Sequence, residues 1–222
     1  MKSRFQDILF ILFAVVVIPF CYWTCGMRGL AVLAWAFFLP LYVLRLVIWS
    51  FWTRLKSWLS AKCTAISWNI LAFGVGGTLG IIVWFVLSTI LNVPRFILPK
   101  WLQMLGFLIA TVGLILALWA QWLLGLQTAI LTTRIFGKDK QEERRVVSTG
   151  PYAIFPHPIF LGEWLTIIGC FLLTSQISLL MLLLIAFLSD MFAASREERD
   201  LQERFGEEYK TYRSRFSVWK QL

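Results

Sequence analysis

The sequence predicts an all-helical integral membrane protein with about six membrane helices, arranged as four spans and a C-terminal hairpin, followed by a cytoplasmic amphipathic helix. Apolar residues make up 59% of the 222 residues, and charged residues only 15%. Soluble domains are nearer half apolar. The mean hydropathy is +0.75, and the charged residues cluster between apolar runs, as is typical of chains that cross a bilayer.

Four apolar runs precede residue 130, at residues 8–25, 30–51, 66–91 and 101–126. Each is close to or above the roughly twenty residues that a helix needs to cross a hydrocarbon core. The first run could pass for a signal peptide, but it has no clear small-residue cleavage site and several spans follow it. In the third run, Gly74, Gly76, Gly77 and Gly80 include a spacing of small residues that lets two helices approach closely.

Two shorter apolar runs follow, at residues 159–173 and 177–194. Thr174, Ser175 and Gln176 separate them, which indicates a tight turn between antiparallel helices. A single bent span is the alternative, but residues 159–194 are too many for one crossing. We therefore predict a helical hairpin.

The charged tail after the hairpin, residues 195–222, is predicted to form one amphipathic helix. Its apolar residues recur at spacings of three and four, which is the helical period. These residues are Leu201, Phe205, Tyr209, Tyr212 and Phe216. This stripe is expected to pack against the membrane-proximal face, with the charged residues pointing outward.

Basic residues predict the orientation. With the N-terminus inside, 17 of the 21 Lys and Arg residues fall on the inner side, and cytoplasmic loops carry such an excess. Both termini are therefore predicted to be cytoplasmic. The net charge of +9 flanks membrane segments instead of lining a soluble face, so membrane lipids are the expected partners and nucleic acid is not. Arg45 lies within a span and is expected to extend its side chain to the headgroups.

The most unusual stretch is residues 150–162, which holds three of the seven prolines and the only histidine. Irregular backbone at a membrane boundary is tolerated only where protein buries it or where it lines a polar cavity. Because a hairpin brings its two ends together, His157 and Glu197 are expected to be neighbours. The chain then divides into residues 1–130, the N-terminal membrane helices, and residues 131–222, the loop, hairpin and tail, within one integrated domain.

Other polar residues in the apolar runs are also notable. A carboxylate such as Glu163 at the start of a membrane run is costly unless it faces a cavity or a partner. Asp190 is expected either at the membrane interface or at a helix contact. The four cysteines are scattered without a Cys-x-x-Cys pair, so neither a disulfide nor a metal site is predicted.

Two blocks of residues resemble the isoprenylcysteine carboxyl methyltransferases and the related phospholipid methyltransferases. The first block is Val146-Val147-Ser148-Thr149-Gly150-Pro151-Tyr152, followed by His157-Pro158 and Gly162. The second is Glu197-Glu198, Leu201, Phe205-Gly206-Glu207-Glu208-Tyr209 and Tyr212. The resemblance covers about a third of the chain. It implies methyl transfer from S-adenosyl-L-methionine to a lipophilic acceptor, either a prenylcysteine-like carboxylate or a lipid headgroup, at the cytoplasmic interface.

The resemblance also implies site residues by position. The cofactor would be held by Arg144, Arg145, Val146, Val147, Tyr152, His157, Pro158, Ile159, Phe160 and Glu197. His157 and Glu197 are the catalytic candidates. Glu163, Arg196 and Glu198 are candidate substrate residues. No metal is implied.

Three positions differ from the family pattern. Pro156 replaces an arginine, Phe160 replaces a tyrosine, and Ala193 replaces an arginine that the resemblance assigns to substrate binding. Arg144, Arg145 or Arg196 are candidates to supply the missing charge. Two alternatives remain open: an NADPH-dependent membrane reductase of the sterol-reductase type, which resembles this C-terminal architecture, and a catalytically silent membrane scaffold.

Overall fold

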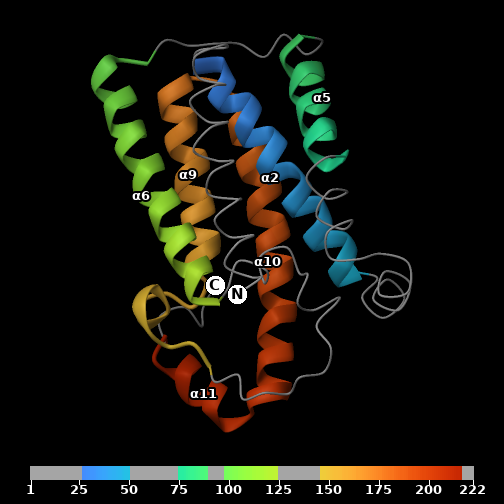
Figure 1. The fold of residues 1–222 in the computed structure, drawn as a ribbon, viewed down its shortest axis with the longest axis vertical. Helices are drawn as coiled ribbons and strands as arrows, with labels where there is room; N and C mark the ends of the chain where they lie inside the picture. The colour runs from blue at the N-terminus through green and yellow to red at the C-terminus, as the bar shows by residue number, and fades with distance from the viewer. Residues whose placement is uncertain (1–26, 51–74, 90–97, 125–145, 217–222) are drawn as a thin grey trace, which may run out of the picture.

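The computed structural model describes residues 27–50, 75–89, 98–124 and 146–216. The elements in these ranges are all helices, as predicted (Figure 1). They are α2 (Met27–Ser50), α5 (Gly76–Thr89), α6 (Lys100–Leu124), the short 3-10 helix η2 (Gly150–Ala153), α9 (Pro158–Thr174), α10 (Ser178–Phe205) and α11 (Glu207–Ser214). The predicted span at residues 8–25 lies outside the described residues, as do Arg144 and Arg145.

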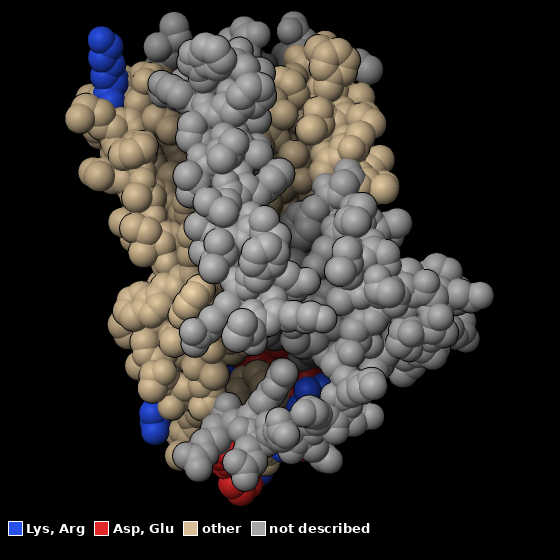
Figure 2. All heavy atoms as spheres, viewed as in Figure 1, with Lys and Arg blue, Asp and Glu red and all other residues tan. Residues whose placement is uncertain are grey.

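Three of the described helices contain segments long and apolar enough to cross a membrane. These segments are Gly29–Val47, Lys100–Leu124 and Ser178–Phe205, and the shorter α5 and α9 are also apolar. In Figure 2 the described side chains along the upper helices are almost all uncharged, whereas acidic and basic side chains gather at the lower end. The chain is therefore a membrane protein, while the number of spans and the orientation stay predictions.

The helices α6 and α9 pack along one another so closely that their backbones touch. A Cβ atom added at Gly113 of α6 would lie 2.6 Å from the Thr166 nitrogen, and one added at Gly162 of α9 would lie 2.6 Å from the Ala117 nitrogen. Gly106 and Gly169 make a second contact of the same kind farther along the pair. Small residues at such interfaces let two helices pack closely, and this packing stabilises their association in lipid, where the hydrophobic effect contributes little.

A second close contact joins α5 to α2, as the spacing of the glycines predicts. A Cβ atom at Gly80 would lie 2.3 Å from the Trp35 carbonyl oxygen, and one at Gly76 would lie 2.6 Å from the Pro40 Cβ. The predicted close approach is confirmed for these two glycines, while Gly74 lies outside the described residues.

The predicted hairpin is confirmed, with its turn at Ser175. This residue adopts a left-handed conformation (φ 56°) and its N–H donates to the Phe171 carbonyl at 2.8 Å, which ends α9. Neighbouring helices hold the turn, because Trp84 of α5 donates to the Gln176 side chain at 3.2 Å. The helices α9 and α10 therefore run antiparallel, and the start of α9 lies beside the lower half of α10 (Figure 1).

The prediction of one tail helix is wrong. The helix α10 continues to Phe205, and Gly206 then breaks it with φ 52°, a conformation that glycine adopts without steric cost. The chain turns there into α11. The apolar stripe survives the break, because Tyr209, Tyr212 and Phe216 form one buried cluster. Val146, Leu201 and Phe205 pack against this cluster.

Replacing Gly113 by leucine should destabilise the protein by about 1 to 3 kcal/mol, because the new side chain meets backbone that cannot move aside without separating α6 from α9. The measurement is the thermal midpoint of the purified protein in detergent. Val112→Leu is the matched control, since Val112 is 59% exposed on the same helix. Equal midpoints for the two variants would contradict the close contact.

Candidate functional site

The breaker-rich segment folds against the lower end of α6. Gly150 has φ 59°, and a Cβ atom there would lie 2.9 Å from the Leu123 side chain. Pro151 follows within η2, whose turn is closed by the Tyr152 N–H donating to the Thr149 carbonyl at 3.2 Å. The prolines thus anchor an irregular backbone at its two ends, since Pro151 and Pro158 are both fully buried.

His157 stands immediately before α9 and points its ring toward α10. Its Nε2 atom lies 3.2 Å from Oε1 of Glu198, and Arg213 of α11 donates to the same oxygen at 3.0 Å. The pKa of the Glu198 carboxyl is lowered, mainly by the hydrogen bond with His157 and further by the charge of Arg213. Three segments distant in the sequence therefore meet at one charged network.

The neighbour expected for His157 was Glu197, but the carboxylate that contacts it is Glu198. Glu197 instead lies close enough to Tyr152 to act on its phenol. Burial raises the pKa of Tyr152 and the nearby Glu197 carboxylate raises it further. The Tyr152 hydroxyl is buried and has no hydrogen-bond partner among the described residues. An orphaned polar group of this kind is costly, and it leaves a free donor beside a carboxylate.

The first turn of α9 packs against the polar end of α10. Phe160 and Ala193 are buried in one small cluster, with Ile159 packed against it. The ring of Phe160 lies parallel to the ring of His157, with a centroid separation of 5.3 Å and an angle of 5°. The structure thus brings together His157, Phe160 and Glu198 of the predicted set.

The segment before η2 is held by α11. The Val146 N–H donates to Glu208 at 3.2 Å, and the Tyr212 hydroxyl donates to the Tyr152 carbonyl at 3.0 Å. Burial raises the pKa of Tyr212 to about 12, so this hydroxyl remains a donor at neutral pH. Val147 is half-buried beside this contact.

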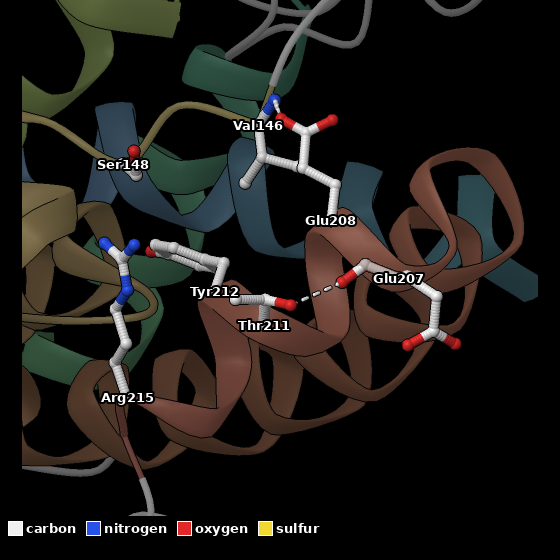
Figure 3. Close-up of a pocket in the computed structure, with 7 residues that line it drawn as sticks. All are labelled: Val146, Ser148, Glu207, Glu208, Thr211, Tyr212 and Arg215. Atoms are coloured by element: carbon white, nitrogen blue, oxygen red, sulfur yellow. Dashed lines mark hydrogen bonds between the residues drawn. The ribbon is translucent and has the colours of Figure 1, made fainter.

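A cavity of about 360 Å³ opens between this segment and α11 (Figure 3). Its walls are formed by Val146, Ser148, Glu207, Glu208, Thr211, Tyr212 and Arg215. Figure 3 shows the Arg215 guanidinium beside the Tyr212 ring, on the side of Ser148. Among the predicted cofactor residues that the structure describes, Val146 alone lies on these walls, so the cavity and the His157 network are separate features.

A second charged cluster lies among the membrane helices, and the sequence analysis missed it. Arg45 of α2 donates to both carboxylate oxygens of Glu163, at 2.7 and 2.9 Å, and also to Asp190 of α10. Trp164 donates to the other Asp190 oxygen at 2.8 Å. Arg45 therefore does not extend to the headgroups, because two buried carboxylates hold it. Charges within membrane helices pair with one another, and that rule could have connected these three residues.

The remaining predicted residues are placed less centrally. Arg196 is exposed, and its guanidinium lies 5.4 Å from the Phe192 ring one turn earlier on α10. Glu163 is 6% exposed, with both oxygens bonded to Arg45. Ala193 replaces the family arginine, and the cation that lies beside Phe160 is Arg45 of α2.

The fold and site define a membrane protein whose polar segments converge at one end of a helical hairpin. Residues 101–208 match the family model for phospholipid methyltransferase. The match covers the first predicted motif block, the hairpin, and the second block as far as Glu208, which confirms the resemblance to the membrane methyltransferases. Among curated proteins and solved structures, none matches the chain.

The contribution of Glu198 to stability should depend on pH. Because its folded pKa is lowered from the ordinary 4.5, its charged contacts stabilise the protein above that value and are lost as the pH falls through the lowered pKa. The difference in thermal midpoint between wild type and Glu198→Gln should therefore be present at pH 7 and disappear in acid.

Glu203→Gln serves as the control for this measurement, since Glu203 is exposed on the same helix. A difference between wild type and Glu198→Gln that stays constant from pH 7 to acid would contradict the role of Glu198 in the network.

Proposed function

We propose that the protein transfers a methyl group from S-adenosyl-L-methionine to a lipophilic acceptor at the cytoplasmic face of the membrane. The observation that carries this proposal is the convergence of both motif blocks at one end of the hairpin, in a part of the chain that matches the phospholipid methyltransferase family model. The family match supports methyl transfer on lipid-like substrates. The cofactor, the side of the membrane and the acceptor belong to the proposal.

The residues at this end fit the polar parts of such a cofactor. The orphaned Tyr152 hydroxyl and the adjacent Glu197 carboxylate offer one donor and one acceptor for ribose hydroxyls or an ammonium group. His157 and the Phe160 ring offer a stacked aromatic surface beside them. Arg144 and Arg145 directly precede Val146 in the chain and are proposed to contribute from there.

The cofactor supplies an electrophilic methyl group on a sulfonium, which a lone pair of the acceptor displaces in line. The chain's task is to position this pair of reactants, because orientation can supply much of the rate acceleration in such a displacement. His157 is fixed by Glu198, and Glu198 is fixed by Arg213. The cluster of Phe160 with Ala193 excludes water from the membrane side of the His157 ring.

The charges near Phe160 favour a lipid headgroup over a prenylcysteine-like carboxylate as the acceptor. Arg45 faces the carboxylates of Glu163 and Asp190. The cluster is therefore neutral when one carboxylate is ionised and negative when both are. It offers no free positive charge to an anionic acceptor. An amine headgroup suits this environment, and it must lose a proton before its lone pair can attack.

Cofactor binding is tested by titrating purified protein with S-adenosylhomocysteine and, separately, with NADPH. We expect S-adenosylhomocysteine to bind and each of His157→Ala and Glu197→Ala to weaken binding about tenfold or more, which corresponds to about 1.4 kcal/mol. Arg204→Ala is the control, because Arg204 is exposed and pairs with Asp200 one turn earlier on α10. Binding of NADPH alone would indicate the reductase, and binding of neither ligand would favour the scaffold.

The acceptor is tested by incubating the protein in vesicles with cofactor carrying a labelled methyl group. One set of vesicles contains an amine-headed phospholipid, and the other contains a prenylated cysteine analogue in a lipid without an amine. We expect label in the amine lipid. Label in the prenylated cysteine alone would overturn the preference for a headgroup acceptor.

A further inference from the structure

Helix α2 lies outside the segment that matches the family model, which begins at residue 101. It nevertheless contributes a side chain next to the motif. Arg45 of α2 reaches α9 and α10 at the same end of the hairpin as His157, because both residues contact Phe160. The site at this end is therefore built from more of the chain than the matched segment.

Arg45 contacts the motif through one aromatic ring. Its guanidinium carbon lies 4.8 Å from the centroid of Phe160, over the ring face. The same ring stacks in parallel on His157. Phe160 is only 6% exposed and packs against Ala193 and Ala194, so it has little freedom to turn. A planar guanidinium stacks well on an aromatic face, whereas an ammonium group has no plane to offer.

Two carboxylates hold Arg45 in this position. Glu163 lies three residues after Phe160 on α9, which places both on the same face of the helix. It binds the guanidinium in a bidentate pair, and Asp190 binds it from α10. Trp164 in turn holds Asp190 at 2.8 Å. The guanidinium has a fixed orientation, because bidentate pairing leaves it little freedom.

We propose that Arg45 is a positioning residue of the methyl-transfer site: clamped by Glu163 and Asp190, its guanidinium holds the Phe160 ring, and through that ring it holds His157. The catalytic part of this proposal rests on the proposed function. The geometry on which it depends is present without any ligand, so it can be tested independently of cofactor binding.

The first test uses the only histidine of the chain as a reporter. Protein labelled at histidine gives ring signals from His157 alone, and these respond to the ring current of Phe160. Arg45→Lys retains the charge that the carboxylates need but loses the planar face. We expect it to shift or broaden the His157 signals in the ligand-free protein. Unchanged signals would overturn the proposal, whatever the cofactor proves to be.

Arg204→Lys is the matched control, an identical substitution at an exposed pair on α10. It should leave the His157 signals and the thermal midpoint unchanged. If Arg45→Lys does not fold, the neutral combination Arg45→Met, Glu163→Gln and Asp190→Asn removes all three charges together and leaves none unpaired. The same shift of the His157 signals is expected there, and its absence overturns the proposal.

The second test is a double-mutant cycle on S-adenosylhomocysteine affinity. If Arg45 acts through Phe160, Arg45→Lys and Phe160→Leu should each weaken binding about fivefold to tenfold. The double variant should then bind S-adenosylhomocysteine about as well as the single variant with the larger loss. Losses that multiply would mean that Arg45 acts by another route. Wild-type protein that binds no S-adenosylhomocysteine would refute the proposed function, while the histidine signals would still decide the role of Arg45.

Discussion

The pairing of Arg45 with Glu163 and Asp190 is the interaction on which the arrangement of the described membrane helices depends. A guanidinium buried among apolar helices is costly unless it is paired, and here its partners of opposite charge come from two other helices. The cluster therefore fixes the rotation and the depth of α2, α9 and α10 relative to one another. Removing one member would leave an uncompensated buried charge, which is far more damaging than losing the whole cluster.

The glycine contacts impose a complementary constraint on α9. Its opposite neighbour α6 approaches until backbone meets backbone at Gly113 and Gly162. Gly162 directly precedes Glu163, so one turn of α9 presents a backbone surface to α6 and a carboxylate to Arg45. The first turns of α9 can thus neither rotate nor slide. This rigidity suits the site, because His157 directly precedes α9 and Phe160 lies in its first turn.

Much of the fold follows from composition. Apolar runs of sufficient length predict helices in a bilayer with little ambiguity, and Thr174, Ser175 and Gln176 marked the turn of the hairpin correctly. The break at Gly206 was missed because Phe205 and Tyr209 keep helical spacing across it, so the stripe alone does not reveal a bend. The available signal was Gly206 itself, a poor helix former within a charged segment.

The site was predictable in its location but not in its contacts. A hairpin brings its two ends together, yet it does not determine which of two adjacent residues faces inward. Consecutive residues on a helix point about 100° apart, and this difference separates Glu198, which contacts His157, from Glu197, which lies beside Tyr152. The Arg45 cluster was missed because each span was considered by itself. Residues such as Glu163 and Asp190 carry no pairing signal until their helices are placed side by side.

The two neighbours of the Phe160 ring, His157 and Arg45, differ in their surroundings. On the side of His157 the network with Glu198 and Arg213 is partly exposed and able to hold a polar ligand. On the side of Arg45 the surroundings are buried and apolar apart from the ion cluster. An acyl chain cannot pass between α6 and α9, because their backbones are in contact. A lipid acceptor would therefore approach the polar network, which is proposed to hold the cofactor, from another face of the hairpin.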